Sequence, residues 1–214
     1  MKIKGIISDL DGTIAATKNI HFEAWKKTAE KFGVKVNLKI NNLEKFWGLK
    51  DLDFLIKYTK ELNIKLDSNM IKHILSLKSQ EYQQLARSIK PDKCLENFLS
   101  LISKYKLKFA IVTSSMKSDA RAILEALNIK YDLLISSDDV KNVKPDPEPI
   151  ILAIEKLGLK KEEIIGLGDS IYDIIAYKKA GLDKIFLINQ DYADAIKIHS
   201  LCDISNMLFK ELIS

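Results

Sequence analysis

The 214-residue sequence has few cysteines and histidines, and it lacks a long hydrophobic run. The two cysteines, Cys94 and Cys202, have no spacing typical of metal ligands, so we expect two reduced, packed thiols rather than a disulfide or a metal site. The dispersed His21, His73 and His199 argue against a zinc centre. No apolar run approaches the roughly 18 residues of a membrane helix, and the early charges at the N-terminus are not typical of a secretory signal peptide. We therefore expect a cytoplasmic protein that does not bind membranes.

Arginine is scarce as well. Arg87 and Arg121 are the only two arginines, although the formal net charge is +5. Nucleic-acid-binding proteins more often cluster their basic residues and use arginine for bidentate contacts, whereas the lysines of this chain are spread over every segment. The lysines indicate a solvated surface with a mild attraction for anionic substrates, and we expect no nucleic-acid partner.

The order of the expected elements predicts an α/β fold. The apolar run Ile3 to Ser8 is typical of a buried parallel strand. After Pro91, short apolar runs at 108–112, 133–136, 164–167 and 184–188 alternate with helical patterns at 95–105, 117–127, 148–157 and 172–180. This alternation predicts a Rossmann-like, doubly wound parallel sheet with helices on both of its faces.

The segment between the first strand and Pro91 shows helical patterns and no strand-like run. His21 to Phe32 is periodic, and two amphipathic stripes follow, one from Leu52 to Leu62 and one from Ile71 to Leu85. We therefore predict an inserted α-helical cap over residues 16–87 and an α/β catalytic core formed by residues 1–15 and 88–214.

Polar residues follow the expected strands at four places. They are Asp9-Leu10-Asp11-Gly12-Thr13, Thr113-Ser114-Ser115, Lys144-Pro145 and Gly168-Asp169, with Asp173 four residues beyond Asp169. Ligands of open parallel sheets bind outside the carboxyl ends of the strands. We therefore expect these four segments to build one site.

The acidic residues of this set indicate phosphoryl transfer. The carboxylate of Asp9 can attack phosphorus, while Asp11 protonates the departing oxygen and later deprotonates water. Two carboxylates and a phosphate need countercharge, which a hard, oxygen-preferring cation such as Mg²⁺ supplies. Asp169 and Asp173 lie one helical turn apart at a strand-to-helix junction, so both can face that ion.

The remaining motif residues offer a hydroxyl and a cation to phosphoryl oxygens, from Thr113 and Lys144. Each motif also has a purely structural explanation. Asp-Gly is a common turn pair, Asp169 is a candidate helix cap, and Lys144 could be a surface lysine before a proline-fixed loop. It is the ordered set of four, rather than any one motif, that favours a site.

The four ordered motifs resemble those of the haloacid dehalogenase-like superfamily, and the resemblance spans the whole chain. The helical insert after the first motif resembles the subgroup of β-phosphoglucomutases, phosphoglycolate phosphatases and sugar phosphatases. The resemblance implies that Asp9 is the phosphorylated nucleophile and Asp11 the acid/base. It also implies that Mg²⁺ is held by the side chains of Asp9 and Asp169 and the backbone carbonyl of Asp11, with Asp173 acting directly or through water.

Two residues of the expected cap also resemble substrate-contacting positions. The stretch His21 to Trp25 resembles the first cap helix of the subgroup, and Lys78 with Tyr82 resembles a cap position that reaches the substrate. We therefore group His21 and Lys78 with Thr113, Ser114 and Lys144 as candidate substrate or phosphate contacts. The structural alternatives are that His21 packs or caps, and that Lys78 extends past an apolar helix face to solvent.

The sequence thus predicts a phosphatase that acts on a small phosphorylated metabolite, phosphoglycolate-like or sugar-phosphate-like, through an aspartyl-phosphate. The alternative is a β-phosphoglucomutase-type phosphotransferase. The segment Trp47-Gly48-Leu49-Lys50-Asp51 resembles the mutases' substrate loop, but it has Asp51 where they carry an arginine, and Ala16 replaces a common acidic residue. A non-catalytic binding protein on the same fold is disfavoured by the complete acidic set. We expect a monomer or a small homo-oligomer.

Overall fold

Six short strands form one parallel sheet. The computed structural model describes residues 2–32, 45–204 and 206–207. The strands are β1 (Gly5–Ser8), β2 (Lys108–Val112), β3 (Leu133–Ile135), β4 (Ile164–Gly168), β5 (Ile185–Ile188) and β6 (Ile196–Ile198), in the order β3-β2-β1-β4-β5-β6. All neighbouring pairs are parallel. The predicted α/β class is confirmed, and β6 is a strand that the sequence pattern did not predict.

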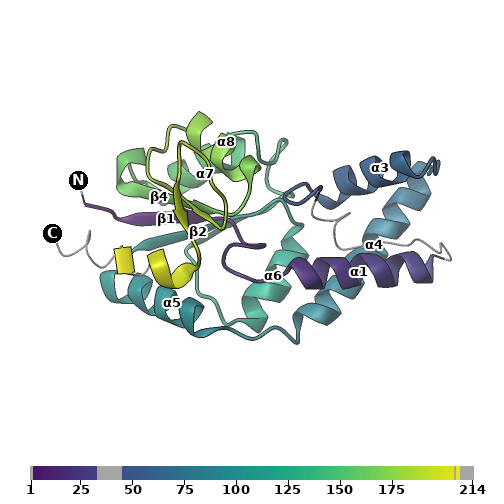
Figure 1. The fold of residues 1–214 in the computed structure, drawn as a ribbon, viewed down its shortest axis with the longest axis horizontal. Coiled ribbons are helices and arrows are strands. Elements are labelled where there is room, and N and C mark those ends of the chain that lie inside the picture. Colours follow the sequence, from purple (N-terminus) through teal and green to yellow (C-terminus); the bar gives the residue numbers. More distant parts are fainter. Residues whose placement is uncertain (1, 33–44, 205, 208–214) are drawn as a thin grey trace.

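Helices cover both faces of this sheet (Figure 1). α5 (Lys93–Tyr105) and α6 (Lys117–Ala126) lie on one face, and α7 (Glu148–Leu157) and α8 (Ile171–Lys179) lie on the other. Successive strand side chains point to opposite faces, so Ile6 packs in the cluster with α5 and α6, and Ile7 in the cluster with α7 and α8. Full burial of such a side chain contributes about 1.5–3 kcal/mol, which explains why the strands are apolar on both faces.

Three further helices project from one end of the molecule: α1 (Lys18–Lys31), α3 (Asp51–Glu61) and α4 (Ser68–Ala86) (Figure 1). They bury a third apolar cluster of their own, which contains Trp25, Phe54, Leu55, Tyr58 and Ile74. No strand occurs in the described part of residues 16–87, and residues 33–44 of the expected cap lie outside the described residues. The boundaries of the cap stay a prediction. None of the described helices is long and apolar enough to cross a membrane.

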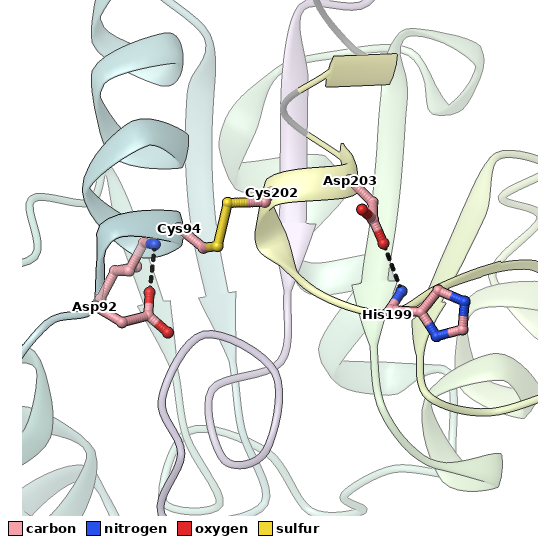
Figure 2. The surroundings of a disulfide bond; sticks show 6 residues. Asp92, Cys94, His199, Cys202 and Asp203 are labelled. Atoms are coloured by element: carbon pink, nitrogen blue, oxygen red, sulfur yellow. Dashed lines mark hydrogen bonds between the residues drawn. A yellow bond between two sulfur atoms is a disulfide. The ribbon is translucent and has the colours of Figure 1, made fainter.

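The two cysteines are paired, so the expectation of two reduced thiols is wrong. Cys94 lies in the first turn of α5, and Cys202 lies in the helical residues 201–204; the two form a disulfide with a Cα–Cα distance of 4.7 Å (Figure 2). The carboxylates of Asp92 and Asp203 accept hydrogen bonds from backbone amides of the same two segments. The cysteines are 108 residues apart in sequence, so their spacing does not indicate that they pair. The contact forms because the two segments meet in the folded chain.

We expect loss of this disulfide to destabilise the protein, because a cross-link restricts the unfolded chain. The typical contribution is about 2–4 kcal/mol, so Cys202→Ser should lose about that much free energy of unfolding in a urea titration without reductant. Dithiothreitol should destabilise the wild type by a similar amount and leave Cys202→Ser unchanged. Two titratable thiols in native wild-type protein purified without reductant would contradict the disulfide.

Candidate active site

A cavity at the carboxyl ends of β1, β2 and β4 collects the residues of all four sequence motifs. The motif residues that line it are Asp9, Asp11, Thr113, Ser114, Lys144, Asp169 and Asp173. His21 from α1 and Asp51 from α3 also line it. Of the candidate residues expected from the sequence, only Lys78 does not line this cavity.

A buried lysine holds two of the carboxylates. The ammonium of Lys144 lies 2.6 Å from Oδ1 of Asp9 and 2.6 Å from Oδ1 of Asp173, and it also donates to the carbonyl of Val112 at 3.0 Å. Burial disfavours the charged ammonium, but the charges of Asp173 and Asp9 outweigh it and raise the pKa of Lys144 above its usual range. Lys144 therefore stays positively charged and orients Asp9.

Asp9, Asp169 and Asp173 form an acidic cluster in which one oxygen of each lies within 4.8 Å of the others. Lys144 supplies one positive charge against these three negative ones. Burial raises the pKa of Asp9 well above its usual value despite Lys144, and burial with the charge of Asp173 raises the pKa of Asp169 to about 7. A divalent cation would relieve this excess, and Mg²⁺ suits a set of oxygen donors. The three residues thus fit a Mg²⁺ site.

The loop after β1 can pass against this cluster because of Gly12. Its φ of +84° favours glycine, and an added Cβ would lie 2.1 Å from Oδ2 of Asp169. The same oxygen accepts a hydrogen bond of 2.8 Å from the indole of Trp47. Nothing in the sequence pattern indicates this contact, because a tryptophan between helical segments is more often part of an apolar core. Here it brings the segment before α3 onto the acidic cluster.

The carboxylate of Asp11 accepts hydrogen bonds from the projecting helices and from the loop after β2. Oδ1 lies 2.7 Å from the hydroxyl of Thr17, 2.8 Å from that of Tyr82 and 3.1 Å from Nε2 of His21; Oδ2 lies 2.7 Å from the hydroxyl of Ser115 and 3.3 Å from that of Thr113. Burial opposes ionisation, but the charge of His21 and the hydrogen bonds of His21, Thr17 and Ser115 outweigh it and hold the pKa of Asp11 below its usual range. Asp11 is therefore held as a carboxylate, and it ties α1 and α4 to the sheet edge.

Ser114 stands apart from its neighbours in the same loop. Its hydroxyl is buried and has no hydrogen-bond partner among the described residues, although Ser114 lines the cavity. A buried polar group without a partner is uncommon, so this hydroxyl is available to a ligand. The sequence motifs point to Ser114 but do not indicate the contacts of Thr17 and Ser115 with Asp11.

Lys78 lies behind the cavity wall. Its side chain is fully buried, and its ammonium lies 2.6 Å from Oδ2 of Asp51, 3.6 Å from Oδ2 of Asp119 and 4.5 Å from the ring centre of Tyr82. This arrangement differs from both expectations for Lys78, since the side chain reaches neither solvent nor the cavity. Its contact with Asp51, which lines the cavity, connects it to the site.

Comparison with known proteins agrees with the resemblance of the motifs. The sequence model of the haloacid dehalogenase-like hydrolases matches residues 6–187. A protein named phosphorylated carbohydrates phosphatase from Thermotoga maritima is 27% identical over 205 residues, 94% of this chain and 88% of the relative. Pyrophosphatase PpaX from Halalkalibacterium halodurans is 26% identical over 186 residues, 85% of this chain and 82% of the relative. The crystal structure of CbbY from Rhodobacter sphaeroides in complex with phosphate has the same fold, with a TM-score of 0.83 and 20% identity over 94% of this chain and 96% of that chain.

Mg²⁺ is expected to stabilise the folded protein, because it neutralises the excess carboxylates. A ligand that binds only the folded state adds about 2.7 kcal/mol at one hundred times its Kd, so Tm should rise with Mg²⁺ concentration. Asp169→Asn should lose most of this rise in a thermal unfolding series. Asp194→Asn removes an exposed carboxylate that does not line the cavity, and it should behave like the wild type. Equal rises for Asp169→Asn and the wild type would contradict the site.

The affinity for Mg²⁺ is expected to fall as the pH drops below 7. The pKa of Asp169 is about 7, so at lower pH this carboxyl is mostly protonated and the ion must displace the proton. Displacing the proton of Asp169 alone weakens the apparent affinity about tenfold between pH 8 and pH 6, and the raised pKa of Asp9 makes the fall steeper. Calorimetric titrations in buffers of different ionisation enthalpy measure both the affinity and the proton released. An affinity that does not change over this range would contradict the assignment.

Proposed function

The chain belongs to the haloacid dehalogenase-like hydrolase family, and we propose that it is a Mg²⁺-dependent phosphatase that acts on a small phosphorylated metabolite. The observation that carries the proposal is the buried carboxylate of Asp9, oriented by Lys144 at the carboxyl end of β1 beside Asp11. The likeness to a relative named phosphorylated carbohydrates phosphatase supports a sugar-phosphate-like substrate. The likeness to a relative named phosphoglycolate phosphatase supports a phosphoglycolate-like one.

Asp9 is the proposed nucleophile. Lys144 holds Oδ1 at 2.6 Å and Thr13 lies 3.3 Å from Oδ2, so the carboxylate has a defined orientation before substrate arrives. An oxygen of Asp9 attacks phosphorus, the bond from phosphorus to the leaving-group oxygen breaks, and an aspartyl-phosphate forms. Mg²⁺, held by Asp9, Asp169 and Asp173, would supply positive charge to the phosphoryl oxygens.

Hydroxyl groups at the end of β2 are proposed to receive the phosphoryl group. The buried, unpartnered hydroxyl of Ser114 can donate to one phosphoryl oxygen, and Thr113 lies beside it at the cavity. Hydrogen bonds from fixed donors to charged oxygens are stronger than those between neutral groups, and they need no rearrangement during the reaction. These groups therefore stabilise the transferring group without providing chemistry of their own.

Asp11 is the proposed acid and base. It gives a proton to the departing oxygen, and its carboxylate then takes a proton from the water that attacks phosphorus and frees Asp9. Its lowered pKa suits the second step. The negative charge of a bound phosphoryl group raises the pKa of a neighbouring carboxyl, which favours protonation for the first step. His21 and Tyr82 hold Asp11 in this position from α1 and α4.

Replacement of the nucleophile is the direct test. Asp9→Asn should lower the rate of p-nitrophenyl phosphate hydrolysis in Mg²⁺ at least about a thousandfold, because loss of a nucleophile removes the covalent route. Asp11→Asn should lower it by about 10²–10⁴-fold, the range of general acid–base catalysis. Asp194→Asn serves as the control, and chelation of Mg²⁺ should abolish wild-type turnover.

Two results would overturn these assignments. Wild-type turnover by Asp9→Asn would remove Asp9 from the nucleophile role. Conversion of β-glucose 1-phosphate to glucose 6-phosphate without release of phosphate would favour the β-phosphoglucomutase-type alternative over the phosphatase.

A further inference from the structure

The start of α3 places a carboxylate on the wall of the cavity. Lys50, Asp51 and Phe54, which we call the α3 wall, line the same cavity as Asp9. The hydrogen bond from Lys78 occupies Oδ2 of Asp51 at 2.6 Å. Oδ1 has no hydrogen-bond partner in the part of the chain that the structure describes, so it remains free to accept one from a ligand.

Lys78 orients this carboxylate but does not neutralise all of the negative charge around it. Its ammonium is fully buried and is shared between Asp51 and Asp119. Asp119 is itself completely buried and is hydrogen-bonded by Ser79 and Gln83 of α4. One ammonium thus serves two carboxylates, and the orientation of Asp51 is set by a group that cannot swing away to solvent.

Two other basic side chains of the cavity already have carboxylate partners. His21 lies 3.1 Å from Oδ1 of Asp11. Lys144 is already held by Asp9 and Asp173. Lys50 is the only other lysine among the described residues that line the cavity, and it is partly exposed, so solvent screens its charge. An anionic group at the far end of a substrate would therefore face the carboxylate of Asp51, whose partner Lys78 is shared with Asp119, with no buried lysine of the cavity free to pair with it.

The rest of this region suits a carbon skeleton. Besides Phe54 of the α3 wall, three aromatic side chains line the cavity: Trp25, Phe46 and Trp47. Binding sites for small molecules commonly combine such apolar surface with a few polar groups that fix orientation. A chain of carbon atoms bearing hydroxyls offers C–H surface to the rings and a hydroxyl donor to Asp51.

We propose that Asp51 selects phosphomonoesters whose leaving group is uncharged and rich in hydroxyls, that is, sugar or polyol monophosphates. Oδ1 of Asp51 accepts a hydrogen bond from a leaving-group hydroxyl, and its negative charge disfavours leaving groups that carry a carboxylate or a second phosphate. Lys78 is the positioning residue for Asp51. The inference rests on the proposed phosphatase function. Of the two proposed substrate classes it favours sugar phosphates over phosphoglycolate, whose leaving group carries a carboxylate.

Sorbitol 6-phosphate and 6-phosphogluconate test the proposal, because they differ only at the carbon farthest from the phosphate, which carries a hydroxymethyl hydroxyl or a carboxylate. Each is measured as an inhibitor of p-nitrophenyl phosphate hydrolysis in Mg²⁺, so binding is compared whether or not the compound is turned over. The wild type should bind sorbitol 6-phosphate at least about tenfold more tightly, a modest effect for like charges near a protein surface.

Two carboxylate-to-amide variants in one helical turn make a matched pair. Asp51→Asn should reduce the preference at least about fivefold, since an amide neither repels a carboxylate nor carries charge. Asp53→Asn, in the same first turn of α3 but not lining the cavity, should keep the wild-type preference. Thermal unfolding of each variant confirms that it is folded.

The outcomes separate this inference from the proposed function. Absence of any Mg²⁺-dependent aryl phosphate hydrolysis refutes the phosphatase itself. The wild type could hydrolyse the aryl phosphate and yet bind 6-phosphogluconate as tightly as sorbitol 6-phosphate, or bind neither. Either result refutes the role of Asp51 and leaves the phosphatase function intact. An unchanged preference in Asp51→Asn does the same, and it would assign the selectivity to another part of the cavity.

Discussion

The buried contact of Lys144 with Asp9 and Asp173 is the interaction on which the site depends. It joins three segments of the chain: the end of β1, the loop before α7 and the first turn of α8. Loss of one partner from such a buried ion pair typically costs about 3–5 kcal/mol, because the remaining charge is left without compensation. The single positive charge of Lys144 does not balance the three carboxylates of the acidic cluster, Asp9, Asp169 and Asp173. The negative charge that remains makes the site suited to a divalent cation.

A second constraint links this sheet edge to the projecting helices. Asp11 is bound by His21 of α1 and Tyr82 of α4, so the position of these helices and the protonation of Asp11 are coupled. The α3 wall then meets the substrate with Asp51. In our proposal the residues at the sheet edge bind the phosphoryl group, and the residues at the helical end contact the leaving group.

Much of this arrangement follows from short-range sequence patterns. Buried parallel strands need apolar residues on both faces, and the helices between them need a regular apolar stripe, so five of the six strands and the helices that cover the sheet are visible in the pattern. Because the carboxyl ends of parallel strands meet at one edge, the same patterns bring Asp9, Thr113, Lys144 and Asp169 to a common cavity. The strand β6 was missed because Lys197 interrupts its three residues, so it lacks the continuous apolar run that reveals β3, a strand of the same length.

The sequence by itself thus determined the α/β fold and the set of acidic residues at the sheet edge. Only the tertiary structure decided the pairing of Cys94 with Cys202 and the partners of Lys78. A helical period shows which face of α4 is apolar, but it does not show that Asp51 and Asp119 converge on that face from segments 27 and 41 residues away in sequence. Such pairings depend on how separate elements pack against one another, and packing leaves no local trace in the order of the residues.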